Sequence, residues 1–361
     1  MPSFKQKSSA LFAVVALVIY ITSLFSNDSN HSITEESTIN NIKNEEGSGT
    51  IVGDAMVMAG RGSGSSENFH ILPDYSNPPS ITTHDLIYND ARNTVPIVIE
   101  EYNLVFFQVA KAASSEWIRF FLRLTGSDLW CKGNIHSKSL VALKHLTDYS
   151  IEEAQEIMTS PDWTRAIFVR HPKPRILSAF LDKAINKKAD FIKDKCRIYA
   201  ARGGTRDECV ERQADFSFFL HNITTTMHDN VHWRSIYSRI DEKWWPWMNY
   251  VANMENLSED AEHFLKSIKS KEDGSSAWDR VGRTGWGEDE RDCDHLGKDP
   301  FLAKKDTRHK TDAKKKMRTY YTKELEDFVE LHYAADLNNP YFRFSEIKLF
   351  DEDAEDKSLR G

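Results

Sequence analysis

The chain has 361 residues, of which 40% are hydrophobic and 11% aromatic, so one or two domains could form a sizeable core and a disordered protein is excluded. Its formal net charge of −8 argues against general nucleic-acid binding. Basic side chains are nevertheless concentrated in residues 173–197 and 304–318, where either solvated helix faces or an anionic ligand would explain them.

The first predicted element is a membrane segment. Residues 10–26 carry no charged side chain, and Lys5 and Lys7 precede them. This pattern predicts a signal anchor, with a cytoplasmic tail at residues 1–9 and the rest of the chain in the secretory lumen. A cleaved signal peptide is the alternative, although the residues around Phe25 do not form a small-residue cleavage site.

A polar segment follows the predicted anchor. Residues 27–97 are rich in Ser, Asn, Gly and Glu, which predicts a flexible stem. Regular structure is expected over residues 98–350, as one folded domain. The acidic tail at residues 351–361 has too few apolar side chains to bury.

The cysteines and glycosylation sequons agree with a lumenal location. Four cysteines allow three disulfide pairings, and the short loop between Cys196 and Cys209 makes a local bridge one candidate. No cysteine or histidine spacing suggests a metal site, so no metal is expected. N-glycosylation sequons occur at Asn27, Asn30, Asn222 and Asn256.

Predicted strands and helices alternate along the folded region. Strands are expected at residues 104–109, 165–170 and 249–253. Helices are expected at residues 115–125, 150–158, 174–187, 258–268 and 322–334. This alternation predicts an α/β fold with a parallel sheet, in which ligands bind beyond the carboxyl ends of the strands.

The first candidate site is the loop KAASS, which joins a predicted strand to a predicted helix. The loop consists of Lys111, Ala112, Ala113, Ser114 and Ser115. The free backbone N–H groups at the start of the helix favour an anion there, and Lys111 adds a positive charge. The loop lacks the GxxxxGK spacing of nucleotide kinases, and a solvated loop lysine is the alternative.

The second candidate site is the segment FVRHPKPRILSAFLDK at residues 168–183. Arg170 ends a buried strand, two prolines begin a helix, and Ser178 lies one to two turns inside that helix. An arginine can donate two hydrogen bonds to a phosphate, and a serine hydroxyl can add one. Lys111 and Arg170 are both expected at the carboxyl edge of the sheet.

These two segments, together with four further blocks, resemble a known family. QVAKAASSEW and FVRHPKPRILSAFLDK are similar to the donor-binding segments of the Golgi carbohydrate sulfotransferases of the chondroitin and dermatan 4-O-sulfotransferase type. The other blocks, in family order, are residues 135–157, 231–237, 250–265 and 309–337. The chain departs from the family pattern at Ala110, Ser114 and Lys173, and it lacks the cysteines that usually follow His-Trp.

The resemblance implies a P-loop-like sulfotransferase fold with a parallel central sheet flanked by helices. It also implies a single-pass type II Golgi membrane protein that uses 3′-phosphoadenosine 5′-phosphosulfate as the sulfuryl donor and a glycan as the acceptor. By this match, residues 111–115 hold the 5′-phosphosulfate, while Arg170 and Ser178 hold the 3′-phosphate.

Sulfuryl transfer requires a cation for the leaving phosphate and a base for the acceptor hydroxyl. Lys111 suits the first role. His136 is the expected base, because an imidazole titrates near neutral pH and this histidine lies in a family-like block. The alternatives are a structural role for His136 and a base elsewhere, at His145, His232 or Glu255.

The sequence allows alternative interpretations of one tryptophan cluster and of the function. The cluster WWPWMNY at residues 244–250 could stack on sugar rings, but a buried core explains clustered tryptophans more often. The function could also be that of a P-loop kinase, or of a non-catalytic lumenal glycan-binding protein with the same fold. The sequence does not identify the acceptor sugar, the sulfated position or the oligomeric state.

Overall fold

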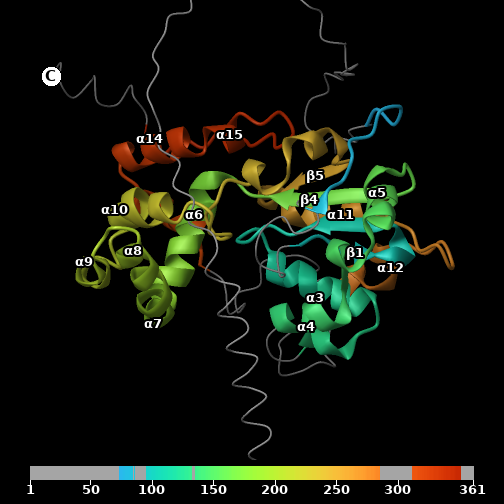
Figure 1. Cartoon of the computed structure of the whole chain (residues 1–361), viewed down its shortest axis with the longest axis horizontal. Coiled ribbons are helices and arrows are strands. Elements are labelled where there is room, and N and C mark those ends of the chain that lie inside the picture. The colour runs from blue at the N-terminus through green and yellow to red at the C-terminus, as the bar shows by residue number, and fades with distance from the viewer. Residues whose placement is uncertain (1–72, 84, 86–94, 132–134, 285–310, 351–361) are drawn as a thin grey trace, which may run out of the picture. The chain divides into compact units, whose positions relative to one another are not determined.

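The computed structural model describes residues 73–83, 85, 95–131, 135–284 and 311–350 (Figure 1). The predicted cytoplasmic tail, signal anchor and acidic tail lie outside the described residues, as does most of the predicted stem. Among the residues that are described, no helix is long and apolar enough to cross a membrane.

The fold is built on a five-stranded sheet in the order β3-β1-β2-β4-β5. Its strands are β1 (Ile97–Ile99), β2 (Leu104–Phe107), β3 (Lys144–His145), β4 (Thr164–Val169) and β5 (Tyr250–Asn253). The strands β2, β4 and β5 are parallel, which confirms the predicted α/β fold and parallel centre of the sheet.

One edge of the sheet is antiparallel, which the sequence did not indicate. Strand β1 is antiparallel to both β2 and β3. Only residues 100–103 connect β1 to β2, and a parallel pair needs a crossover of about a dozen residues or more, so the two strands can pair only as a hairpin. Asn103 makes the tight connection possible with a left-handed backbone φ of 45°.

Alternate residues of the central strands face two different cores. Leu104 and Phe106 face one core with α3 (Ser114–Leu124) and α11 (Leu257–Ser267). Val105 faces the other core, which includes side chains of α5 (Ile151–Thr159). This alternation follows from the two-residue period of a strand, and it explains why the central strands are apolar without interruption.

Several of the remaining helices lie around α6 at one end of the sheet, whereas α4 and α12 lie near α3 and β1 (Figure 1). The remaining helices are α4 (Ile135–Ala142), α6 (Pro172–Phe180), α7 (Lys188–Asp190), α8 (Arg197–Ala201), α9 (Arg206–Glu211), α10 (Phe216–Phe218), α12 (Ala277–Arg280), α13 (Ala313–Tyr320), α14 (Lys323–His332) and α15 (Ala334–Leu337). We call the region formed by residues 172–224 the helical lobe. It shares a core with α13 and α14, which is separate from the two cores on the faces of the sheet.

Several short helical turns complete the fold. The 3₁₀ turns are η2 (Glu100–Tyr102), η3 (Asp128–Cys131), η4 (Leu146–Asp148), η8 (Tyr237–Arg239), η9 (Glu242–Trp247), η10 (Met254–Asn256) and η11 (Gly282–Thr284). The π-helical turns are η5 (Leu181–Asn186), η6 (Phe191–Cys196) and η7 (Phe219–Thr224). The predicted helix 174–187 is therefore a regular helix only as far as Phe180, after which the wider turn η5 begins.

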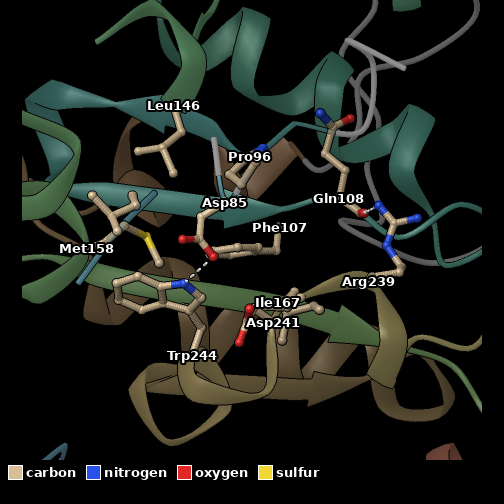
Figure 2. A pocket seen from close by; sticks show the side chains of 12 residues that line it. Asp85, Pro96, Phe107, Gln108, Leu146, Met158, Ile167, Arg239, Asp241 and Trp244 are labelled. Carbon is tan, nitrogen blue, oxygen red and sulfur yellow. Dashed lines mark hydrogen bonds between the residues drawn. The ribbon is translucent and has the colours of Figure 1, made fainter. Parts of the chain in front are cut away.

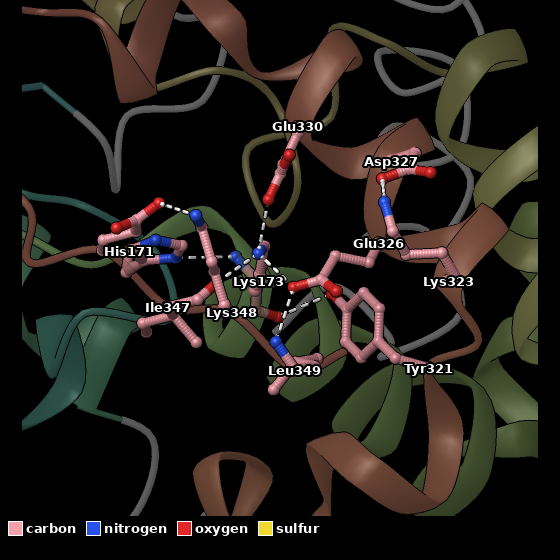
Figure 3. A network of polar contacts seen from close by, with 11 residues as sticks. His171, Lys173, Tyr321, Lys323, Glu326, Asp327, Glu330, Ile347, Lys348 and Leu349 are labelled. Atoms are coloured by element: carbon pink, nitrogen blue, oxygen red, sulfur yellow. Dashed lines mark hydrogen bonds and ion pairs between the residues drawn. The ribbon is translucent and has the colours of Figure 1, made fainter. Parts of the chain in front are cut away.

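Two cross-links fix the helical lobe. A disulfide joins Cys196 to Cys209, which confirms the local bridge. In the first turn of α6, the ammonium of Lys173 contacts Glu326, Glu330 at 2.6 Å and the carbonyl of Ile347 (Figure 3). This network attaches α14 and the C-terminal residues 346–350 to the first turn of α6.

The three tryptophans of the WWPWMNY cluster belong to the core. Trp244, Trp245 and Trp247 are 2%, 1% and 4% exposed, so they cannot offer a face to a sugar ring. They pack on the α5 side of the sheet. Burial in the core is thus confirmed as the reason for this cluster.

Candidate active site

The three parallel strands each deliver one ionisable residue to the same edge of the sheet. Lys111 lies four residues after β2, Arg170 directly follows β4, and Glu255 lies two residues after β5. Because these strands are parallel neighbours, their carboxyl ends meet, as expected for a ligand site in an α/β fold.

The loop after β2 has an unusual backbone. Lys111 and Ala113 have φ values of 68° and 58°, in the left-handed region that residues with a Cβ rarely adopt. The amide of Ala112 donates to the carbonyl of Val109 at 3.1 Å, and Ala113 is the residue immediately before α3. Such conformations cost roughly 1–3 kcal/mol each and persist only where the surroundings hold them.

Two arginines hold this loop through consecutive carbonyl groups. Arg170 Nη1 donates to the carbonyl of Lys111 at 2.9 Å, and Arg175 Nε donates to the carbonyl of Ala110 at 3.2 Å. Arg175 Nη1 also donates to the carbonyl of Arg234 at 2.7 Å. Arg170 thus lies at the predicted donor loop, and burial lowers its pKa to about 10, which leaves the guanidinium charged at neutral pH.

The side chain of Lys111 is paired with a carboxylate of the helical lobe. Lys111 Nζ lies 3.1 Å from Asp182 Oδ2, and Lys183 Nζ lies 3.2 Å from the same oxygen. Burial lowers the pKa of Lys111 to about 8, an effect that Asp182 partly opposes. Lys111 therefore has a charge that responds to pH changes near neutrality.

His136 lies beside the first turn of α3. Its Nε2 atom is 3.0 Å from the hydroxyl oxygen of Ser115. The structure therefore brings the predicted base next to the predicted donor loop, from a helix that begins twenty residues later in the sequence. Its role as a base remains a prediction.

Ser178 is buried in α6 with only 3% of its surface exposed. Its hydroxyl oxygen accepts a hydrogen bond from Thr311 Oγ1 at 3.0 Å. Ser178 thus lies on the helix that follows Arg170, and its hydroxyl contacts the segment just before α13. Its contact with a 3′-phosphate also remains a prediction.

Glu255 and the other candidate bases lie in different surroundings. Glu255 Oε1 accepts from the backbone amide of His171 at 3.2 Å, and burial raises the pKa of this carboxyl. The pKa of His232 is well below its ordinary value because of burial and of the charges of Lys183 and Lys111, so its imidazole is neutral. His145 lies on β3, which β1 separates from β2, away from the loop.

The sequence interpretation missed three residues of the site, namely Arg175, Asp182 and Lys183. A helical signal could have found two of them, since Arg175, Ser178 and Asp182 follow one another at i, i+3 and i+7. Residues at this spacing share one face of a helix. Lys183 is the next residue along η5.

A small cavity lies on the α5 side of the sheet, beside the end of β2 (Figure 2). Its volume is about 30 Å³, which is enough for one or two water molecules and too small for a nucleotide. Polar contacts at its rim join Arg239 to the carbonyl of Gln108 at 2.6 Å and Trp244 to Asp85 at 3.0 Å. This cavity is therefore not the donor site.

Among the described residues, no group of three or more His, Cys, Asp or Glu side chains could hold a metal ion.

Comparison with known proteins gives one family and several distant relatives. A family model described as the sulfotransferase family matches residues 96–331. Carbohydrate sulfotransferase 9 of Homo sapiens is 26% identical over 184 residues, which are 47% of this chain and 40% of that protein. Carbohydrate sulfotransferase 8 of Homo sapiens is 25% identical over 192 residues, which are 50% of this chain and 44% of that protein.

A third relative is carbohydrate sulfotransferase 11 of Rattus norvegicus, which is 27% identical over 192 residues, or 49% of this chain and 53% of that protein. The chain thus spans about half the length of the curated relatives it matches. No solved structure matches the chain.

Proposed function

The chain belongs to the sulfotransferase family, and from this premise we propose that it transfers a sulfuryl group from 3′-phosphoadenosine 5′-phosphosulfate to a hydroxyl group of a glycan. One observation carries the proposal. Arg170, at the end of β4, donates to the carbonyl of Lys111 at 2.9 Å, so cations from two neighbouring strand ends converge on one loop. The donor is anionic at both ends, and these residues have the charge that it requires.

The donor would occupy the edge where β2 and β4 end. Residues 111–115 would hold the 5′-phosphosulfate, with Lys111 as the cation and the first backbone N–H groups of α3 as donors. Arg170 would hold the 3′-phosphate through the guanidinium atoms that do not contact the loop, and Ser178 would add its hydroxyl. Helix α6 links these last two residues within nine positions of the chain.

The chemistry follows from these positions. Lys111 stabilises the negative charge that develops on the bridging oxygen as the bond between this oxygen and sulfur breaks, and the electron pair stays on the oxygen. A new bond forms between sulfur and the acceptor oxygen. His136 takes the proton of the acceptor hydroxyl, and the products are a sulfated glycan and adenosine 3′,5′-bisphosphate.

The acceptor is proposed from resemblance alone. The quoted blocks are similar to those of chondroitin and dermatan 4-O-sulfotransferases, so desulfated chondroitin and dermatan are the first acceptors to test. The three relatives named above are carbohydrate sulfotransferases by name, which supports a glycan acceptor in general.

We also propose a location and a domain arrangement. Residues 10–26 anchor the chain in the Golgi membrane, residues 27–97 form a stem, and residues 98–350 form the lumenal catalytic domain. The uncharged segment after Lys5 and Lys7 supports this topology. The disulfide between Cys196 and Cys209 is typical of a secretory compartment.

The experiment incubates the detergent-solubilised full chain with ³⁵S-labelled donor and a panel of desulfated glycans, followed by linkage analysis of the product. We expect labelled glycan in the presence of EDTA. Transfer of phosphate from ATP with Mg²⁺, without sulfuryl transfer, would instead support the kinase alternative. Donor binding without turnover on any glycan would support a non-catalytic glycan-binding protein.

A further inference from the structure

Asp182 places one carboxylate oxygen between two ammonium groups. Its Oδ2 atom lies 3.1 Å from Lys111 Nζ and 3.2 Å from Lys183 Nζ. The side chains of Lys111 and Asp182 are only 10% and 7% exposed, so this contact is shielded from solvent. A shielded ion pair is stronger than an exposed one, because less water screens the two charges.

The backbone holds both partners in place. Arg170 and Arg175 hold the carbonyls of Lys111 and Ala110, which fixes the direction in which the Lys111 side chain leaves the loop. Asp182 lies in the first residues of η5, which continues α6 without a break. The same helix therefore supports the loop through Arg175 and supplies the counter-ion of its lysine.

We propose that Asp182 is a positioning residue for the donor lysine: in the ligand-free protein its carboxylate keeps Lys111 charged and oriented, and the donor then replaces it as the partner of Lys111. Lys183 remains as the partner of Asp182 in the donor complex, so the carboxylate is not left buried without a cation. This inference rests on the proposed function, because it assumes that Lys111 binds the phosphosulfate group.

Lys111 has cationic neighbours, so it needs the carboxylate of Asp182 to stay charged. Asp182 and Lys183 face Lys111 from η5, and Arg170 faces it from the end of β4. His232 faces it from the segment after η7 as a neutral imidazole. Burial and the two neighbouring cations all lower the pKa of Lys111, and Asp182 opposes them, so the ammonium persists up to a pH of about 8.

Asp182→Asn should therefore have opposite effects at low and high pH. An opposite charge within about 4–6 Å shifts a pKa by about 1–3 pH units, so the pKa of Lys111 should fall by that amount in the variant. Near pH 4.5, below this lowered pKa, the variant should bind adenosine 3′,5′-bisphosphate at least as tightly as the wild type, because Lys111 is protonated in both proteins and no carboxylate competes for the ammonium. Above pH 7 it should bind more weakly, because Lys111 is then neutral.

The experiment measures the affinity for adenosine 3′,5′-bisphosphate from pH 4.5 to 9.5 by titration calorimetry, as the ratio of variant to wild type at each pH. This ratio cancels the ionisation of the ligand itself. Asp182→Glu should restore the wild-type profile. Asp190→Asn, which removes an exposed carboxylate of α7, is the matched control and should leave the profile unchanged.

A second readout needs no ligand. The rate at which acetic anhydride labels Lys111, followed by mass spectrometry over the same pH range, reports the pKa of its amine. An equal midpoint in wild type and Asp182→Asn would overturn the inference, and so would a uniform loss of affinity at every pH. A wild type that does not bind the bisphosphate would refute the proposed function instead.

Discussion

Arg170 donates to the carbonyl of Lys111, and we propose that it also binds the 3′-phosphate of the donor. Its substitution by alanine should weaken the binding of adenosine 3′,5′-bisphosphate, because a hydrogen bond to a charged group contributes about 1.5–3 kcal/mol. This corresponds to a dissociation constant about 10- to 150-fold higher. Titration calorimetry of the folded variant measures the change.

The control for Arg170→Ala is Lys187→Ala, which removes an exposed cation of the helical lobe and should change the affinity little. If Arg170→Ala keeps both its fold and the wild-type affinity, then Arg170 does not contact the nucleotide. Its hydrogen bond to the loop would then be purely structural.

His136 is the residue whose substitution should separate chemistry from binding. His136→Ala should lower kcat by about 10²- to 10⁴-fold, the usual contribution of a general base, and leave bisphosphate affinity near that of the wild type. Steady-state kinetics and calorimetry on the same preparation check both expectations. Ser115→Ala, which removes the hydroxyl beside His136 Nε2, tests whether that contact orients the ring.

A His136→Ala enzyme with nearly normal kcat would contradict the assignment. The next candidates would then be His232, whose imidazole is neutral beside Lys111 and Lys183, and Glu255, whose raised pKa favours proton uptake. His145 would follow last, because β3 is two strands away from β2.

The Lys173 network joins α6, α14 and residues 346–350 (Figure 3). Lys173 and Glu326 are 1% and 4% exposed in their side chains. Lys173→Met should lower the free energy of unfolding by about 3–5 kcal/mol, because it leaves the carboxylate of Glu326 buried without its cation. Urea unfolding measures the loss.

A nearby ion pair provides the matched control for Lys173. Lys323 and Asp327 lie 2.5 Å apart on the surface of α14, with side chains 37% and 53% exposed. Lys323→Met should therefore cost no more than about 1 kcal/mol. The double variant Lys173→Met with Glu326→Gln should regain part of the stability, and equal losses in the two single variants would contradict a special role for the buried pair.

Most of the central elements could be predicted from the sequence because their patterns are strong. The run Leu104–Phe107 is continuously apolar, and the stripe on α3 that includes Trp117 and Phe121 has a clear helical period. Strands β1 and β3 were not predicted, since three and two residues are too few to show a period. Their pairing depends on the short connection after Ile99 and not on a local pattern.

Part of the candidate site could also be predicted, because two of its residues lie at strand ends with a clear local pattern. Lys111 and Arg170 each follow a strand, and the position of a strand end can be read from local sequence. Their ion pair and hydrogen bonds could not be predicted, because Asp182 and Arg175 reach the loop from residues more than sixty positions away. Such contacts depend on how α6 packs against the sheet.

The proposed membrane topology makes a prediction about residues outside the described ranges. In intact Golgi vesicles, protease added from outside should remove a tag fused to the N-terminus and leave the domain from residue 98 onward protected. Lys5 and Lys7 before the uncharged segment predict this orientation. Protection of the tag, or release of a soluble cleaved chain, would contradict the anchor.

We propose that the loop after β2 carries out sulfuryl transfer with Lys111 as its cation. The most direct test is the rate of ³⁵S transfer from labelled donor to desulfated chondroitin or another glycan of the panel, in a single turnover, for the wild type and Lys111→Ala. The wild type should form one labelled sulfate ester for each adenosine 3′,5′-bisphosphate released, with EDTA present, and the variant should be about 10²- to 10³-fold slower at saturating donor. Equal rates in the two proteins, or a wild type that binds the donor and transfers no label to any glycan, would contradict the account.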